Sequence, residues 1–379
     1  MANIFFGVSG EGRGHATRVR AQVEALRAAH DITVFASGEA FSFLAPLYDQ
    51  TDVRVRRIAG LRFHYSPNRR LDFTATALRA MDFVRRLPEE CEALSREFLE
   101  HRPDLVVSDF EPVLPRAARR HGVPFLSVDH QHFLTTYDLS SLPRRLRLRA
   151  FFMAAIVRAY FQGQRETVVS SFYFPPLRRS CVATTQVGVM LRGEIRAARP
   201  SHGRYLVAYL RRFAGRGFLE ALNAIGREVV VYGLGERPTV GRLRFRAVDE
   251  ERFLEDLAGC DALLSTAGNQ VVGEALYLRK PVFAMPEARN FEQYINAHFL
   301  KRTGAGDWLD LERVTENALR DFLDRVDDYR RGIRAGRLDG LPATLQVMER
   351  HLPAPGAVPG REWKSSRVDR VEQADRVAL

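Results

Sequence analysis

Short apolar runs alternate with helical stretches along the chain, beginning at the N-terminus. Residues 4–8 are apolar, residues 16–29 carry apolar side chains at helical spacing, and residues 31–36 are again mostly apolar. This order predicts a strand, a helix and a second strand, which together imply a right-handed crossover and a parallel sheet. The same pattern predicts further strands at 105–108 and 124–128, separated by a helix at 113–121.

The alternation restarts near residue 204 and predicts a second parallel sheet. Its predicted strands are 205–210, 228–232, 243–247, 262–265 and 281–285, and its predicted helices are 217–224, 250–258, 270–278 and 290–302. Gly, Pro and Arg residues interrupt the pattern over 190–203, which indicates a domain boundary. The sequence therefore predicts an α/β protein of two Rossmann-like domains, 1–190 and 203–352, that face each other across a cleft. Residues 353–379 are rich in Pro, Gly and charge and are predicted to form a disordered tail.

Length and composition agree with this organisation and limit the function. At roughly 100–200 residues per domain, 379 residues suggest two domains. No apolar run reaches the roughly 20 residues that span a bilayer, and the first residues lack the features of a signal peptide. The three cysteines are far apart, so neither a disulfide framework nor a zinc site is predicted, and we expect a cytoplasmic protein.

The net charge of +11 comes almost entirely from arginine. A basic surface suits nucleic acid, an anionic membrane or a phosphorylated small molecule, and an arginine-rich composition alone would also produce it. No sequence motif of a nucleic-acid-binding domain is present, so nucleic acid is not an expected partner.

Residues 144–176 combine arginines with aromatic and aliphatic residues. One interpretation is a core helix with a basic N-terminal approach. The other is a basic and apolar patch that contacts a membrane surface, on its inner face, or a lipid-linked acceptor.

A glycine-rich loop, Gly10-Glu11-Gly12-Arg13-Gly14-His15, follows the first predicted strand. Its spacing differs from the dinucleotide fingerprint, and no acid follows the second strand, which argues against NAD. Glycines at the start of a helix leave backbone amides free for an anion. Histidine ordinarily titrates near neutrality, and the positive end of a helix favours its neutral form, so His15 is a candidate general base.

Two further polar groups follow predicted strands in the first half. Asp109 comes directly after a strand and can orient a neighbouring imidazole, with Glu111 as the second candidate. Asp129, His130 and His132 follow the next strand. Two histidines and one acid without another ligand cluster do not predict a metal site, so we expect these three residues to contact an acceptor.

The most informative run lies in the second half and begins with Ser265-Thr266-Ala267-Gly268-Asn269. Small residues at a helix start let backbone amides meet a diphosphate. Glu274, further along that helix, has two carboxylate oxygens suited to a ribose diol. Glu292 and Gln293 follow the next strand and loop, where sugar hydroxyls are expected.

This run resembles the donor-site signature of GT-B glycosyltransferases, and is closest to their MurG-like and UDP-glycosyltransferase branches. The glycine loop resembles the GxGGH-type loop of the same families, so the resemblance covers residues 1–135 and 203–306. It implies that Thr266, Ala267, Gly268 and Asn269 bind the phosphates, Glu274 the ribose, Glu292 and Gln293 the sugar, and Val248 the base through its backbone. It implies His15 as the base, Asp109 as its partner, and acceptor contacts from the first half; the candidates there are Gly12, Gly14, Glu111, Asp129, His130 and His132.

Three departures leave the donor open. Ala267-Gly268 stands where paired glycines are usual, Arg279 replaces a common glycine before Lys280-Pro281, and Glu292 replaces a frequent aspartate.

The expected reaction is an inverting transfer from a nucleotide-sugar, most simply a UDP-sugar, to the hydroxyl of a small-molecule or lipid-linked acceptor. No bound cofactor and no metal are expected, because no DxD pattern stands in a suitable loop, and Arg211 or Arg212 would help to meet the diphosphate charge. A UDP-sugar 2-epimerase of the same fold and a non-catalytic nucleotide-sugar-binding module are the alternatives.

Overall fold

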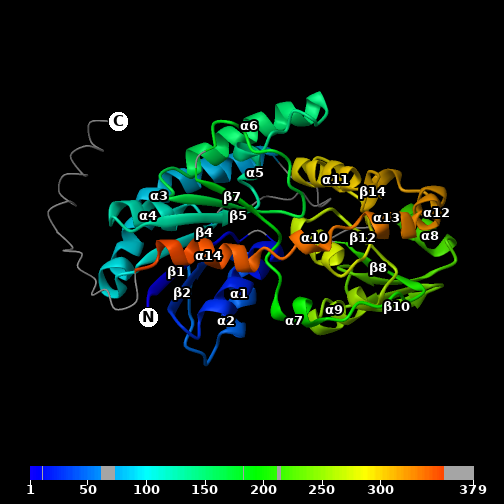
Figure 1. Cartoon of the computed structure of the whole chain (residues 1–379), viewed down its shortest axis with the longest axis horizontal. Coiled ribbons are helices and arrows are strands. Elements are labelled where there is room, and N and C mark those ends of the chain that lie inside the picture. The colour runs from blue at the N-terminus through cyan, green and yellow to red at the C-terminus, as the bar shows by residue number, and fades with distance from the viewer. Residues whose placement is uncertain (11, 61–72, 182, 211–214, 354–379) are drawn as a thin grey trace.

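The computed structural model describes residues 1–10, 12–60, 73–181, 183–210 and 215–353. Figure 1 shows two α/β units side by side, one built mainly from the N-terminal half and the other from the C-terminal half. The sequence prediction of two Rossmann-like domains is therefore confirmed. Arg211, Arg212 and the predicted tail after Pro353 lie outside the described residues.

The first sheet has seven parallel strands in the order β3-β2-β1-β4-β5-β6-β7. Neighbouring residues of β1 point to opposite faces, and Phe5 and Phe6 are both fully buried, because helices cover both sides. The strands are β1 (Asn3–Val8), β2 (Asp31–Ala36), β3 (Arg54–Arg57), β4 (Leu105–Asp109), β5 (Phe125–Asp129), β6 (Glu166–Ser170) and β7 (Thr184–Val187). The helices are α1 (Arg13–Leu26), α2 (Gly38–Leu47), α3 (Phe73–His101), α4 (Val113–Arg120), α5 (Phe133–Thr136) and α6 (Arg144–Tyr160).

The second sheet also has seven strands, in the order β10-β11-β9-β8-β12-β13-β14, and only the β10–β11 pair is antiparallel. The strands are β8 (Tyr205–Tyr209), β9 (Glu228–Tyr232), β10 (Arg237–Val240), β11 (Leu243–Arg246), β12 (Ala262–Ser265), β13 (Val282–Ala284) and β14 (Gly306–Trp308). The helices of this half are α7 (Gly193–Ala197), α8 (Arg216–Ala224), α9 (Glu250–Gly259), α10 (Asn269–Tyr277), α11 (Phe291–Thr303), α12 (Glu316–Asp324) and α13 (Val326–Gly332), with 3-10 turns at Leu311–Arg313 and Ala335–Arg337. The last helix of the chain is α14 (Leu341–His351).

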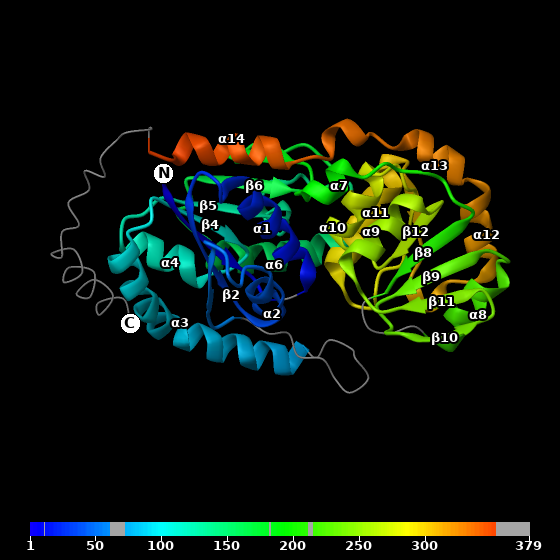
Figure 2. The ribbon, with the colours of Figure 1, turned by 90° about the horizontal axis from the view of Figure 1, so that it is seen from below.

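The last helix departs from the predicted domain division. The sequence assigned residues 203–352 to the second domain, but α14 returns to the first sheet, as Figure 2 shows. Leu341, Val347 and Met348 are buried in the same core cluster as β1. These apolar side chains of α14 therefore cover one face of the first sheet.

The chain crosses between the domains twice, and the two crossing segments lie against each other. Val189 pairs with Asp339, and the Gly340 N–H donates to the Val189 carbonyl at 2.9 Å. A Cβ on Gly188 would lie 2.3 Å from the Leu338 carbonyl oxygen, so only glycine permits this approach. The crossing segments thereby fix the two sheets at a short distance from each other.

Candidate active site

The strand order reverses at one place in each sheet, and these places locate the candidate site. In the first sheet the reversal lies between β1 and β4, and in the second between β8 and β12. Ligands of open α/β sheets bind at the carboxyl ends of the strands at such points. Three residues that the sequence singled out lie at these strand ends: His15 in the first turn of α1 after the loop that follows β1, Asp109 as the last residue of β4, and Thr266 directly after β12.

The loop after β1 orients α1 so that its N-terminus points toward the second domain. Gly12 has φ 77° and ψ 160°, a conformation open essentially to glycine alone, and α1 begins at Arg13. A Cβ on Gly14 would lie 3.8 Å from the Cβ of Gln270, in the first turn of α10. The N-termini of α1 and α10 therefore meet across the domain boundary, which brings the two predicted halves of the site together.

His15 and Asp109 form a buried pair at this junction. His15 Nδ1 lies 2.7 Å from Asp109 Oδ1, and the two residues are 8% and 1% exposed. We assign the imidazole proton to this bond, which leaves Nε2 as an acceptor. Phe110, held at φ 54° directly after Asp109, stacks against the imidazole with ring centroids 6.4 Å apart. No described residue bonds Nε2, so that nitrogen is available to a substrate proton.

Arg18 is a third member of this group, and the sequence analysis missed it. Its Nε and Nη2 donate to the two Asp109 oxygens, each at 2.8 Å, and Arg18 is only 3% exposed. Burial alone would raise the pKa of Asp109, but the Arg18 and His15 charges and hydrogen bonds lower it below its usual range. Arg18 lies three residues after His15, so the two side chains are neighbours on one face of α1. This spacing was the sequence signal that could have identified Arg18.

A second histidine–aspartate pair lies nearby, in the loop after β5. The His132 N–H donates to Asp129 Oδ1 at 2.9 Å, and His132 Nδ1 lies 2.7 Å from Asp129 Oδ2. Phe161 touches both this pair and Phe110, with ring centroids 5.1 Å from His132 and 5.3 Å from Phe110. Phe110 and Phe161 therefore form an aromatic wall that connects the two histidine–aspartate pairs.

His130 connects the domains, and its geometry does not favour the acceptor contact predicted for it. The imidazole is fully buried, with Nδ1 3.0 Å from the Ser170 carbonyl and Nε2 3.1 Å from Asn296 Oδ1. Burial lowers the pKa of His130. Asn296 in turn donates to the Ala267 carbonyl at 3.0 Å. This chain of contacts ties the loop after β5 to the loop after β12.

Glu111 also has a different role from the predicted one. Its two carboxylate oxygens accept the N–H groups of Val113 and Leu114 at 2.7 and 2.8 Å, so it caps the start of α4. It is 1% exposed, which leaves no surface for an acceptor. Burial raises the pKa of Glu111 to about 7, against the lowering effect of the two N–H groups.

The burial of Glu111 makes the stability of the folded protein depend on pH. The folded pKa of about 7 lies above the ordinary value of 4.5, so the contribution to stability is complete below pH 4.5 and lost as the pH rises through 7. At about 1.4 kcal/mol per pKa unit, the loss is about 3 kcal/mol. Chemical unfolding of the protein and of Glu111→Gln across this pH range measures it. The variant should lack this component of the slope, and parallel curves for the two proteins would contradict the assignment.

The loop after β12 has the form expected of an anion site. Ala267 takes φ 64°, a left-handed conformation that favours glycine, and Gly268 precedes the first turn of α10. The Ser265 hydroxyl and Gln270 Oε1 are buried and bonded to none of the described residues. Thr266 is buried beside them. The N-terminus of α10 therefore combines free backbone amides, the positive end of the helix dipole and unpartnered polar side-chain atoms.

Other predicted donor residues on α10 are already engaged by the protein. Asn269 Nδ2 donates to the Ser170 carbonyl at 3.1 Å, which makes it part of the domain contact. Glu274 is 3% exposed, accepts a hydrogen bond from Gln270 at 2.9 Å and lies 3.6 Å from Arg192. A ribose diol would reach Glu274 only by replacing one of these partners. Arg192, which lies in the predicted domain boundary, was not anticipated as a neighbour of the site.

The remaining predicted donor residues lie at the start of α11 and after β11. Glu292 is half-buried, and its charge acts on Arg18 and His130 across the domain boundary. Gln293 is buried, and its Oε1 accepts the Glu287 N–H at 2.8 Å. Val248 is half-buried and packs on the core of the second domain. Glu292 is therefore a donor candidate whose charge acts on Arg18, a member of the His15 group.

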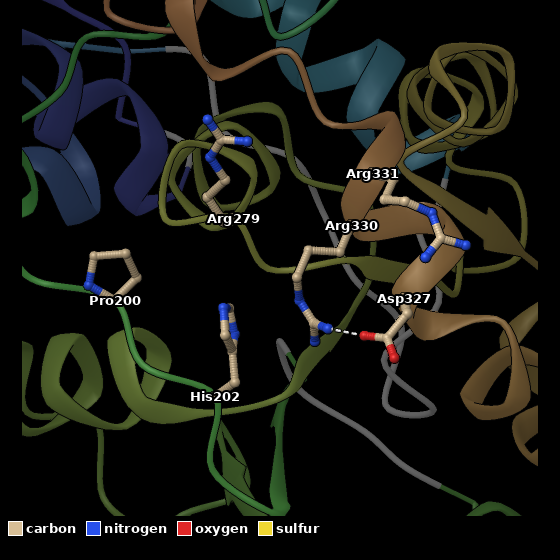
Figure 3. Close-up of a pocket in the computed structure, with 6 residues that line it drawn as sticks. All are labelled: Pro200, His202, Arg279, Asp327, Arg330 and Arg331. Atoms are coloured by element: carbon tan, nitrogen blue, oxygen red, sulfur yellow. Dashed lines mark hydrogen bonds and ion pairs between the residues drawn. The ribbon is translucent and has the colours of Figure 1, made fainter.

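A separate cavity of about 340 Å³ opens on the opposite edge of the second sheet, near the amino ends of β8, β12 and β13. Figure 3 shows its arginines Arg279, Arg330 and Arg331 with Pro200, His202 and Asp327. Arg330 donates to Asp261 at 2.6 Å and also to Asp327, and Arg331 pairs with Asp328. Aspartates thus already compensate two of the three arginines, and the cavity lies away from the strand ends where the domains meet.

Two parallel sheets whose carboxyl ends meet at a domain boundary define the GT-B arrangement that the sequence predicted. The sequence matches the family model of glycosyl transferase family 1 over residues 2–327, so the chain belongs to this family. The protein is a glycosyltransferase, a class that takes its sugar from a nucleotide-sugar donor. Comparison with curated proteins finds no match.

Solved structures share the fold at low sequence identity. CalG4, the calicheamicin glycosyltransferase, is 18% identical with a TM-score of 0.65, covering 93% of this chain and 98% of that chain. MurG of Acinetobacter baumannii is 13% identical with a TM-score of 0.60, covering 92% and 100%. The spinosyn rhamnosyltransferase SpnG, solved with thymidine diphosphate, is 15% identical with a TM-score of 0.60, covering 92% and 100%.

Proposed function

We propose that the protein transfers a sugar from a nucleoside diphosphate sugar, with UDP as the first candidate, to an acceptor hydroxyl with inversion at the anomeric carbon. The observation that carries this proposal is the buried His15–Asp109 pair at the N-terminus of α1, facing the N-terminus of α10. One terminus supplies a base and the other supplies amides for an anion, which are the two requirements of a direct displacement.

His15 is the base of the proposed reaction. Its Nε2 takes the proton of the acceptor hydroxyl while the acceptor oxygen attacks the anomeric carbon. Asp109 holds the imidazole in the required tautomer and stabilises the imidazolium that forms. Because Arg18 binds both Asp109 oxygens, Asp109 stays ionised and fixed in position rather than becoming the final proton acceptor.

The leaving nucleoside diphosphate is proposed to rest on the loop after β12. As the bond from the anomeric carbon to the diphosphate oxygen breaks, negative charge grows on that oxygen. The N–H groups of Ala267, Gly268 and Asn269 and the positive end of α10 stabilise it, with the Ser265 hydroxyl as a further donor. These groups replace a divalent cation in the proposed mechanism. Arg211, the predicted side-chain donor, lies outside the described residues.

The sugar and the acceptor are proposed to meet between α11 and the aromatic wall. Glu292 accepts sugar hydroxyls, since it is half-buried and its charge reaches the His15 group. The Asp129–His132 pair and Phe161 flank the acceptor, while Glu111 and His130 are excluded from that role by their buried structural bonds. Glu274 remains the candidate residue for binding the ribose. The ribose diol would then replace Gln270 or Arg192 as a partner of the Glu274 carboxylate.

A donor and product analysis tests this function. UDP-sugars and dTDP-sugars are offered with a panel of hydroxyl acceptors in the presence of EDTA, and NMR coupling constants report the anomeric configuration of the product. We expect slow release of nucleoside diphosphate without acceptor, and an inverted glycoside with acceptor. Retention of configuration or loss of activity with EDTA would contradict the mechanism, and interconversion of free sugar nucleotides would instead establish an epimerase.

A further inference from the structure

Helix α6 carries a row of large apolar side chains that faces solvent. Leu148, Phe151, Phe152 and Ile156 are 59%, 64%, 61% and 44% exposed, and they supply half of the large exposed hydrophobic residues in the described part of the chain. The rings of Phe151 and Phe152 contact each other, with centroids 5.9 Å apart. Exposed apolar residues gathered in this way mark an interaction surface, whereas single ones are ordinary.

The opposite face of α6 holds the helix to the first domain. Leu146, Ala150, Ala154 and Val157 are buried, and the helix packs on α5 and α11. Figure 1 shows α6 at the outer edge of the molecule. The sequence prediction of a core helix is therefore correct for one face only, and the outward face has no cover from the described residues.

Arginines border the apolar row on both sides. At about 3.6 residues per turn, Arg149 falls on one flank, Arg147 and Arg158 fall on the other, and Arg145 lies at the N-terminal end of the row. The helix contains no acidic residue, and these four arginines form no ion pair with any described residue. Each is exposed, so the charged ends can extend past the apolar row while their stems cover its edges.

We propose that α6 docks flat on the surface of a bilayer that contains anionic phospholipids. The apolar row enters the boundary between head groups and acyl chains, and the flanking arginines bind the phosphates of the head groups. A second copy is a poorer occupant, because two such helices face to face would oppose their arginine rows. Every helix in the described residues is too short or too polar to cross the bilayer, so this contact is peripheral.

The docking surface adjoins the candidate active site. Phe161, directly after α6, contacts Phe110 and His132, and α6 packs on α11, whose first turn carries Glu292. The bound bilayer would therefore lie beside the acceptor side of the cleft, a consequence that rests on the proposed function. The docking itself needs no donor and is tested without one.

Sedimentation with vesicles tests the proposal on the full chain. Vesicles of phosphatidylcholine alone are compared with vesicles that also contain phosphatidylglycerol, for the natural sequence, for Phe151→Ser/Phe152→Ser, and for Leu99→Ser as control. Leu99 is a similarly exposed residue on α3. Binding should require phosphatidylglycerol, weaken with salt, and fall about tenfold or more in the double variant but not in the control.

A second measurement guards against misfolding and self-association. The double variant should keep its circular dichroism spectrum and its thermal midpoint, because both side chains are exposed. No binding to phosphatidylglycerol vesicles, or equal binding by the double variant, would overturn the proposal. A dimer in light scattering that the double variant abolishes, without vesicle binding, would assign the surface to a second copy instead.

Discussion

Replacing His15 by alanine is expected to lower kcat for sugar transfer by about 10²–10⁴-fold while leaving the affinity for the nucleotide-sugar almost unchanged. The reason is that Nε2 takes the acceptor proton, whereas the donor rests on the loop after β12 in the other domain. Steady-state transfer rates and isothermal titration with the donor measure the two quantities separately.

The matched control for this variant is His202→Ala. His202 lines the cavity at the opposite edge of the second sheet, so its loss should change neither quantity. Transfer by His15→Ala at the rate of the natural sequence would remove His15 from the mechanism. A parallel loss of donor affinity would place the imidazole at the donor instead of the acceptor.

Replacing Arg18 by methionine is expected to lower the free energy of unfolding by about 3–5 kcal/mol, because Asp109 would remain charged and buried without its partner. The effect should be complete above about pH 4 and shrink as the pH falls further and acid protonates Asp109, since the pKa of this carboxyl is lowered below its ordinary value of 3.8 in the folded state. Chemical unfolding across that range measures it.

A double-mutant cycle separates this pair from general packing. Arg18→Met/Asp109→Leu should cost much less than the sum of the two single variants, because no charge is left unpaired. Arg27→Met is the surface control. Its pair with Glu24 is exposed on the same helix, so the cost should be about 0–1 kcal/mol. Additive effects at Arg18 and Asp109 would show that the two residues are not energetically coupled.

The fold was predictable from the sequence because buried parallel strands are continuous apolar runs. Residues 4–8, 105–108 and 262–265 have this form and became β1, β4 and β12. The strand β3, with the sequence Arg-Val-Arg-Arg, was missed because it lies at the sheet edge and shows no apolar run. The position of α14 was missed because tertiary contacts, and not local sequence, decide which sheet a terminal helix covers.

Two departures from the family pattern have a structural explanation that local sequence alone does not supply. Ala267 and Arg279 stand where glycines are common in the resembling families, and both take a left-handed conformation, at φ 64° and 60°. The backbone at these positions therefore has the shape that glycine favours, although the side chains differ.

The sequence predicted the strand-end residues of the site, with Asp109 as the partner of His15, but it did not predict Arg18. His15 and Asp109 follow strands that are neighbours in the sheet, so their meeting follows from topology. Arg18 lies inside a helix, where arginine is ordinarily a surface residue, and only its contact with Asp109 reveals its role. Glu111 was predicted to contact the acceptor, but it caps α4 instead. A polar residue at a strand end can bind a ligand or cap the next helix, and the sequence does not distinguish these two roles.

A crystal structure with bound UDP tests the central claim most directly. We expect diphosphate oxygens within about 3 Å of the N–H groups of Ala267 to Asn269, on the side of α10 that faces His15. A diphosphate held by the arginines of the cavity beside His202, with the N-terminus of α10 empty, would contradict it.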